Sequence, residues 1–107
     1  MVMKILAIVP SFNEAENITH VIEAIKEENS LIDILVVNDC SKDETGTLAE
    51  STGQASVVNL SSNLGIGGAV QTGFKYAMRE GYDIAFQFDG DGQHLASEIK
   101  KIGRAHV

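Results

Sequence analysis

The sequence of 107 residues contains little cysteine and no long hydrophobic run. Its single cysteine, Cys40, can form no disulfide within the chain, which is typical of proteins from a reducing compartment. A small buried side chain is a more common role for such a residue than a reactive thiol. No run approaches the roughly 18 apolar residues that span a bilayer, so we expect no transmembrane segment. The composition indicates an ordinary soluble globular protein.

Positive charge is also scarce. Eight Lys and Arg residues stand against fifteen Asp and Glu residues, which gives a net charge of −7. A field of this sign repels nucleic-acid backbones and anionic membrane surfaces, so we expect neither as a direct electrostatic partner. The apolar run near the start is short, stops at Pro10 and has no small-residue cleavage site, so it does not indicate a signal peptide. A cytoplasmic location is therefore expected.

The sequence does contain an alternation of apolar runs and amphipathic segments, and the length predicts a single domain over residues 1–107. We expect residues 103–107 to be a frayed tail. The apolar runs, which are typical of buried strands, occupy residues 4–9, 31–38, 55–60 and 82–88. No repeat, low-complexity tract or linker interrupts them.

Three amphipathic segments separate these runs. The first has Ile18, Val21, Ile22 and Ile25 on one helix face, and a capping box of Asn13 and Glu16 predicts a start near residue 13 or 14. The second follows a similar box of Ser41 and Glu44. The third has a predicted buried face of Val70, Phe74, Ala77 and Met78.

Strands that alternate with helices predict an α/β fold, with a Rossmann-like, mostly parallel sheet of about four strands and flanking helices. Residues 95–107 are long enough for one short helix and a tail. The outer strands of so thin a sheet would have open edges. We therefore expect a homo-oligomer that forms through exposed sheet edges.

Polar residues collect where the predicted strands end, and in an open parallel sheet ligands bind at this edge. The residues concerned are Pro10, Ser11, Asn13 and Glu14; Asn38, Asp39, Ser41 and Asp43; Asn63, Gly65, Gly67 and Gly68; and Asp89, Asp91, Gln93 and His94. Some have simpler explanations: Asn13 and Ser41 can cap helices, Glu14 can favour a helix N-terminus, and the glycines can make a tight turn.

The pair of Asp89 and Asp91 is harder to explain by a simple turn. The two carboxylates are separated by one glycine and repel each other unless a cation lies beside them. Hard divalent ions such as Mg²⁺ take carboxylate and phosphate oxygens, so the pair indicates a metal or diphosphate site. His94 fits a metal or phosphate contact and an ordinary loop histidine equally well.

Two other chemistries fit part of this pattern. Residues 39–50 resemble a calcium loop, with Asp39, Ser41, Asp43 and Glu50 at ligand positions. Glu44, however, stands where the sharp turn requires glycine, and the segment follows a strand rather than a helix. An aspartate-nucleophile phosphatase also places an Asp-x-Asp pair after a strand, but it is the first strand in that family and the fourth one here.

Four segments together point to one family. "IVPSFNE", "VVNDCSKDET", "NLGIGGAVQTGFKYA" and "FQFDGDGQH" occur in the order and approximate spacing found in inverting nucleotide-sugar glycosyltransferases of family 2 with the GT-A fold. The chain most closely resembles the branch of polyprenyl-phosphate (dolichyl-phosphate) mannosyl- and glucosyltransferases. The resemblance covers residues 4 to about 94 and implies that the chain is the N-terminal, donor-binding half of a GT-A fold.

The resemblance also implies roles for individual residues. Pro10, Asn13 and Glu14 would line the nucleotide pocket, and Asp39 would accept a hydrogen bond from the base. Asp89 would lie near the ribose or sugar of the donor. With Asp91, it would hold Mg²⁺ or Mn²⁺ on the donor diphosphate. Gln93 and His94 match the "GQH" that often follows in the family and are possible further contacts.

The function that this resemblance implies is metal-dependent transfer of a hexose from a GDP- or UDP-sugar, with a polyprenyl phosphate as the expected acceptor. In such enzymes the acceptor half and the acidic general base come after the Asp-x-Asp motif, so the base is not expected within this chain. The lipid-phosphate or sugar acceptor would then belong to a full-length enzyme at the cytoplasmic membrane face. The alternative is a truncated, non-catalytic module that binds nucleotide or itself.

Overall fold

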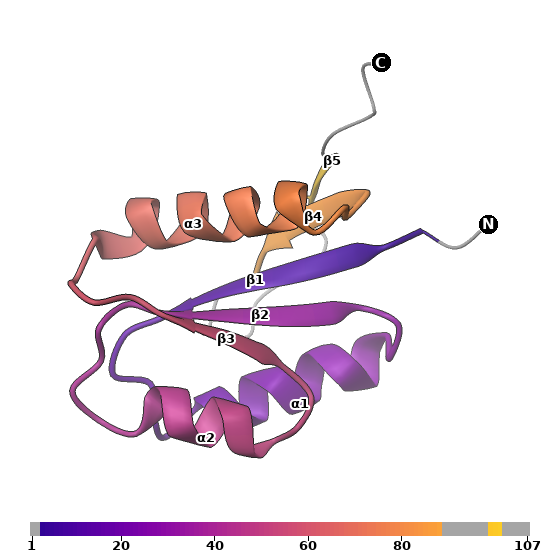
Figure 1. Cartoon of the computed structure of the whole chain (residues 1–107). Coiled ribbons are helices and arrows are strands. Elements are labelled where there is room, and N and C mark those ends of the chain that lie inside the picture. The colour runs from indigo at the N-terminus through magenta and orange to yellow at the C-terminus, as the bar shows by residue number, and fades with distance from the viewer. Residues whose placement is uncertain (1–2, 89–98, 102–107) are drawn as a thin grey trace.

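The computed structural model describes residues 3–88 and 99–101. Figure 1 shows the order of its elements along the chain. They are β1 (Ile5–Ser11), α1 (Ile18–Glu28), β2 (Asp33–Asn38), α2 (Thr45–Ser51), β3 (Ser56–Asn59), α3 (Gly65–Arg79), β4 (Ile84–Gln87) and β5 (Ile99–Lys101).

These strands form one sheet in the order β3-β2-β1-β4-β5. The first four are parallel to one another, which confirms the predicted α/β class and mostly parallel sheet. The prediction of a short helix after residue 94 is wrong for Ile99–Lys101, which form the strand β5 and pair antiparallel with β4. This pairing satisfies backbone groups along the outer edge of β4, which a helix at the same place would leave open.

The sheet is covered on both faces, with α3 on one side and α1 and α2 on the other (Figure 1). Successive side chains of a strand point to opposite faces, so both sets are largely buried in the central strands β1 and β2, whose sequences are continuous apolar runs. The edge strand β3 is only half-buried at its centre and exposed at its ends. The core on the α1 and α2 side includes Ala7, Val9, Ile34, Val36 and Phe86, and the core on the α3 side includes Leu6, Ile8, Leu35, Val37 and Ala85.

The buried face of α1 is the predicted one, since Ile18, Val21, Ile22 and Ile25 are all buried. Its predicted start is wrong. The helix begins at Ile18, and the N-cap residue has no side-chain cap bond. The capping box fails because the side chain of residue 13 finds a partner outside its own helix, in the loop after β2.

The predicted capping box of α2 is wrong for the same reason. This helix begins at Thr45, with Glu44 at its N-cap and no side-chain cap bond. The hydroxyl of Ser41 instead accepts a hydrogen bond from the loop after β1.

The buried face of α3 agrees with the predicted one only in part, since Ala77 is buried and Phe74 packs half-buried against the core as predicted. The helix buries Ala69, Gly73 and Ala77, whereas Met78 is 64% exposed. Small residues line the contact because the helix lies very close to β1: a Cβ atom built on Gly73 would lie 2.4 Å from the Cγ2 atom of Ile8. The prediction is wrong in placing Met78 at the contact and in omitting Ala69 and Gly73.

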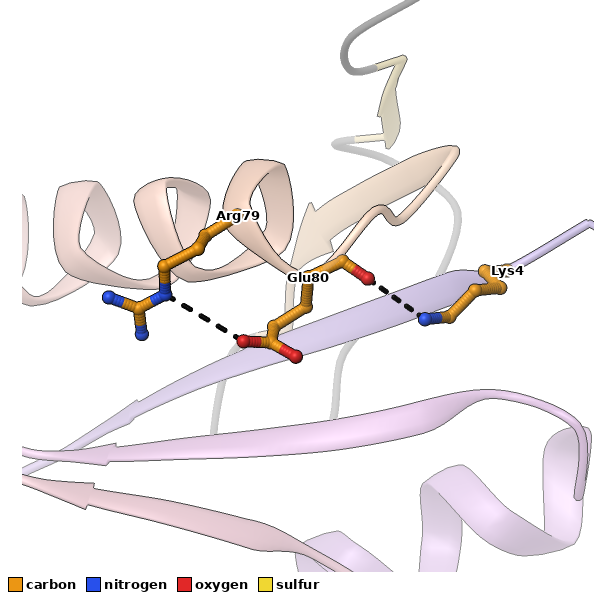
Figure 2. A network of polar contacts seen from close by, with 3 residues as sticks. All are labelled: Lys4, Arg79 and Glu80. Atoms are coloured by element: carbon orange, nitrogen blue, oxygen red, sulfur yellow. Dashed lines mark hydrogen bonds and ion pairs between the residues drawn. The ribbon is translucent and has the colours of Figure 1, made fainter.

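Lys4, the residue just before β1, is tied to the connection between α3 and β4. Figure 2 shows the Lys4 ammonium donating to the backbone carbonyl of Glu80, at 2.9 Å, while Arg79 faces the Glu80 carboxylate at 3.7 Å. The Lys4 ammonium also lies 4.4 Å from the centre of the Tyr82 ring. One side chain thus joins two segments that are far apart in the sequence.

We expect Lys4→Met to lower the free energy of unfolding by about 1 kcal/mol, because it removes a hydrogen bond from a charged group and a cation–π contact. The matched control is Arg79→Met, which removes an exposed ion pair and a longer contact, 6.0 Å, with the Tyr76 ring, and should change stability by less than about 0.5 kcal/mol. Urea unfolding of both variants measures the difference. Equal losses would show that the Lys4 contacts contribute no more than a surface charge.

Candidate functional site

Four buried polar residues gather at the edge of the sheet where the parallel strands end. Ser11 and Asn38 are the last residues of β1 and β2, and Asp39 and Thr45 lie in the connection to α2 and at its start. Each is at most 8% exposed, and they are all of the buried polar side chains within residues 3–88. Because a buried polar group without partners is costly, their hydrogen bonds determine how this edge is built.

Asn13 connects the loop after β1 to the loop after β2. Its backbone N–H donates to the Ser41 hydroxyl at 2.9 Å, and its side-chain Oδ1 accepts from the Lys42 N–H at 2.9 Å. Its φ of 54° lies in the left-handed region, which asparagine tolerates better than most residues. The predicted helix cap is therefore a bridge between two loops.

Thr45 and Asp43 extend this bridge to the next two residues. The Glu14 N–H donates to the Thr45 hydroxyl oxygen at 2.8 Å, and the Ala15 N–H donates to Asp43 Oδ2 at 3.2 Å. The Thr45 hydroxyl in turn donates to Asp43 Oδ1. This hydroxyl bond is the main reason that the pKa of Asp43 lies below its ordinary value, with backbone N–H groups adding to the effect and desolvation opposing it.

Asp39 links β2 to the start of α3. Its carboxylate oxygens accept from the backbone N–H groups of Leu64, at 2.7 Å, and Gly65, at 2.9 Å. Its own N–H donates to the Ser11 carbonyl at 2.8 Å, and the Asn63 amide donates to its carbonyl at 3.2 Å. The resemblance implied a contact with a base, and the structure shows two backbone partners that the sequence did not indicate.

The ends of β2 and β3 are joined by a pair of asparagines. The side-chain amide of Asn38 donates to Asn59 Oδ1 at 2.8 Å, and the Ser41 N–H donates to Asn38 Oδ1 at 3.3 Å. A Cβ atom on Gly46 would lie 2.7 Å from both Asn38 Nδ2 and Asn59 Oδ1. Sequence reasoning missed Asn59, Gly46 and Thr45, although asparagines that end two neighbouring strands were a usable signal.

The glycines after β3 form the start of α3. Gly65 has a φ of 80°, which favours glycine, so the tight-turn interpretation holds at this position. A Cβ atom on Gly68 would lie 2.6 Å from the Cβ of Leu64, whereas Gly67 has open space. The glycine-rich segment thus shapes the turn into the helix, and its first N–H groups are bound by the Asp39 carboxylate.

The structure brings four of the predicted site residues to this edge. Pro10 lies in β1 beside β2, Asn13 and Glu14 follow in the loop, and Asp39 follows β2. Glu14 is half-buried, and its carboxylate accepts from the Asn17 side chain at 3.3 Å. The remaining predicted residues, which lie outside the described residues, are Asp89, Asp91, Gln93 and His94.

A groove of about 880 Å³ lies at the opposite end of the sheet, where β2 and β3 begin. Three of its polar side chains already have partners: the Lys26 ammonium donates to the carbonyls of Ser30 and Ile32, and the Tyr82 hydroxyl donates to Asp33 at 2.7 Å. Burial and the Asp33 carboxylate raise the pKa of Tyr82. Because ligands of parallel sheets bind at the carboxyl ends of strands, the buried polar edge is the stronger candidate.

Two further properties concern metals and membranes. Within residues 3–88 and 99–101, no three His, Cys, Asp or Glu side chains are grouped so that they could hold a metal ion. None of the helices described is both long and apolar enough to cross a bilayer.

Comparison with known proteins identifies relatives of this chain. The sequence model of the family described as "Glycosyl transferase family 2" matches residues 6–105. The polyprenol monophosphomannose synthase of Mycolicibacterium smegmatis is 33% identical over 102 residues, covering 91% of this chain and 38% of the relative. The undecaprenyl-phosphate mannosyltransferase of Micrococcus luteus is 30% identical over 104 residues, covering 94% of this chain and 43% of the relative. The chain thus spans less than half the length of these two proteins.

Solved structures show the same fold. TarS of S. aureus, solved in complex with UDP-GlcNAc, superposes with a TM-score of 0.72 at 26% identity and covers 83% of this chain and 27% of that one. The mannosyltransferase PcManGT of Pyrobaculum calidifontis, solved with GDP-Man and Mn²⁺, superposes with a TM-score of 0.70 at 25% identity. That match covers 82% of this chain and 27% of the other. These likenesses confirm the predicted GT-A architecture.

Proposed function

Because this chain belongs to glycosyl transferase family 2, we propose that it carries the donor-binding part of an enzyme that transfers a hexose from a GDP- or UDP-sugar to a polyprenyl phosphate. The observation that carries this proposal is the match over more than 90% of the chain to proteins named as polyprenol- and undecaprenyl-phosphate mannosyl enzymes. A polyprenyl chain is a membrane lipid, so action at the cytoplasmic face of a membrane is part of the proposal. The family match gives no support to the phosphatase alternative.

We assign the donor nucleotide to the buried polar edge. Its support is the gathering of Asn13, Glu14 and Asp39 at one end of the sheet, beside Pro10 of β1. A carboxylate oxygen accepts more than one hydrogen bond, so Asp39 can bind the N–H of a base while it holds the start of α3. Uracil and guanine both offer such an N–H, and solved relatives carry either UDP-GlcNAc or GDP-Man.

A divalent cation, Mg²⁺ or Mn²⁺, belongs to the proposed site. The Mn²⁺ in the PcManGT complex supports it. Asp89 and Asp91 would hold the ion, since paired carboxylates suit hard divalent cations. Asp89 directly follows Phe88, and Asp91 comes two residues later. The Phe88 N–H donates to the Ile8 carbonyl at 2.8 Å, so Phe88 lies beside β1. When bound, the ion neutralises negative charge on the departing diphosphate.

Calorimetric titration with GDP and UDP tests the proposal, first with Mn²⁺ and then with EDTA. We expect one nucleotide to bind, and only in the presence of the ion. Asp91→Asn should weaken metal-dependent binding by about 100-fold or more, because it removes a proposed metal ligand, and should leave the thermal midpoint unchanged. The matched control is Glu27→Gln, which makes the same charge change on the exposed side of α1.

Each outcome separates the possibilities. If neither nucleotide binds, this chain is not a donor-binding unit. Binding that persists in EDTA, or that survives Asp91→Asn, contradicts the proposed metal site. Nucleotide binding without hydrolysis or transfer of the sugar favours the alternative of a non-catalytic binding module. Self-association through a sheet edge stays a prediction; the outer edge of β3 has no strand partner among the described residues.

A further inference from the structure

Three consecutive backbone N–H groups after β1 are all bound by side chains from the loop after β2 and from the first residue of α2. The Asn13 N–H donates to the Ser41 hydroxyl, and the next two donate to the hydroxyl of Thr45 and the carboxylate of Asp43. The three acceptors, Ser41, Asp43 and Thr45, are called the loop clamp here. These bonds join segments about 30 residues apart in the sequence.

The clamp acts in both directions. Asn13 Oδ1 accepts the Lys42 N–H at 2.9 Å, so each loop donates to the other. Asn13 also has a φ of 54°, a conformation that persists in non-glycine residues only where the surroundings hold it. The clamp therefore holds the N–H side of the loop that carries Asn13 and Glu14, while the Glu14 carbonyl accepts the Asn17 and Ile18 N–H groups at the start of α1.

Thr45 is the central member of the clamp. Its side chain is fully buried, and its hydroxyl proton is directed to Asp43 Oδ1. The hydroxyl lone pairs are then available to the Glu14 N–H, which lies 2.8 Å from the oxygen. Without this hydroxyl, the N–H of Glu14 and one oxygen of Asp43 both lose a partner.

We propose that Ser41, Asp43 and Thr45 are positioning residues for donor binding, which hold the loop of Asn13 and Glu14 in the conformation that accepts the nucleotide. This rests on the proposed function, since that loop lines the proposed donor pocket. The clamp residues act through the loop and need no contact with the donor. A loop that is competent for only part of the time lowers the apparent affinity in proportion to that fraction.

The hydroxyl of Thr45 provides the test. Thr45→Val keeps the shape of the side chain and removes the hydroxyl, whereas Thr45→Ser keeps the hydroxyl and removes a buried methyl group. With Mn²⁺ present, Thr45→Val should raise the nucleotide Kd about tenfold, and Thr45→Ser should stay within about twofold of the wild type. Ile25→Val, a core change at the far end of α1, controls for the loss of stability alone.

Backbone amide hydrogen exchange is measured on the same variants. We expect exchange at Glu14 and Ala15 to be faster in Thr45→Val and close to wild type in Thr45→Ser. A role in stability alone would make affinity follow the thermal midpoint, with Ile25→Val weakened as much as Thr45→Val. That result, or equal nucleotide affinity in Thr45→Val and wild type, overturns the proposal.

The proposed function can fail separately. If the wild-type chain binds neither nucleotide, the clamp is judged by amide exchange alone. Exchange at Glu14 and Ala15 that is faster in Thr45→Val than in Thr45→Ser then supports the clamp, and equal exchange overturns it.

Discussion

Replacing Gly73 with alanine is expected to lower the free energy of unfolding by about 2 kcal/mol, whereas the same change at Gly67 raises it by about 0.5 kcal/mol. Both residues belong to α3, so their helix propensities improve alike. They differ in surroundings: a Cβ atom on Gly73 would lie within 3.1 Å of three atoms of Ile8, and a Cβ atom on Gly67 would meet nothing within 4 Å.

The Ile8 side chain cannot move away easily, because it is fully buried between the sheet and α3. Overpacking usually costs about 1–3 kcal/mol, and we expect the clash at Gly73 to cost an amount near the top of this range. The gain in helix propensity offsets about 1 kcal/mol of that cost. Thermal unfolding followed by circular dichroism should separate the two variants by more than about 10 °C. Similar midpoints would mean that α3 moves away from the sheet at little cost.

Removing the carboxylate of Asp39 is expected to lower the free energy of unfolding by about 3 kcal/mol. Asp39→Ala leaves the Leu64 N–H at the start of α3 without its partner and removes one of two acceptors of the Gly65 N–H, which also donates to Asn63 Oδ1 at 3.1 Å. Hydrogen bonds to charged groups contribute about 1.5–3 kcal/mol each and are not fully additive. The N-cap residue of α3 has no side-chain cap bond, so Asp39 supplies this role from another part of the chain.

Asp39→Asn is the graded comparison, because asparagine keeps one side-chain oxygen and loses the charge. Its loss should be about half as large. Urea unfolding without nucleotide and metal isolates stability from any role of Asp39 in binding a base. An Asp39→Ala variant as stable as wild type, with an unchanged dependence on urea, would show that the two bonds contribute nothing net.

The layers of the fold were predictable from the sequence because they depend on local patterns. Continuous apolar runs predicted strands covered on both faces. The strands β1, β2 and β4 are largely buried as expected, whereas β3, at the edge of the sheet, is only half-buried at its centre and exposed at its ends. The spacing of Ile18, Val21, Ile22 and Ile25 predicted the buried face of α1 for the same reason. A period of 2 or 3.6 residues is visible within a short window.

The helix starts were not predictable, because their polar residues have distant partners. Asn13 and Ser41 each have a glutamate three residues later, which is the spacing of a capping box. The Asn13 N–H instead donates to the Ser41 hydroxyl, 28 positions away. A local motif and a loop-to-loop bridge use the same residue types, so the sequence cannot distinguish them. Asp39 shows the same limit, since its partners at Leu64 and Gly65 lie 25 and 26 residues away.

The predictions for the contact face of α3 and for residues 99–101 failed for different reasons. Hydrophobicity favoured Met78 for the contact, but this side chain is 64% exposed, and the closeness of α3 to β1 selected Gly73 instead. Pairing with the edge of β4 decided the structure of residues 99–101. The roles expected for Asp89, Asp91, Gln93 and His94 lie outside the described residues and stay predictions.

The amino end of α3 is already occupied by an anion of the protein itself. A helix start with glycines is ordinarily a place where phosphate groups bind, because its N–H groups are free and its dipole favours negative charge. Here the Leu64 and Gly65 N–H groups hold the Asp39 carboxylate, so a phosphate at the same point would meet a like charge. A diphosphate at this edge therefore needs a separate positive charge, in a chain whose own net charge is −7.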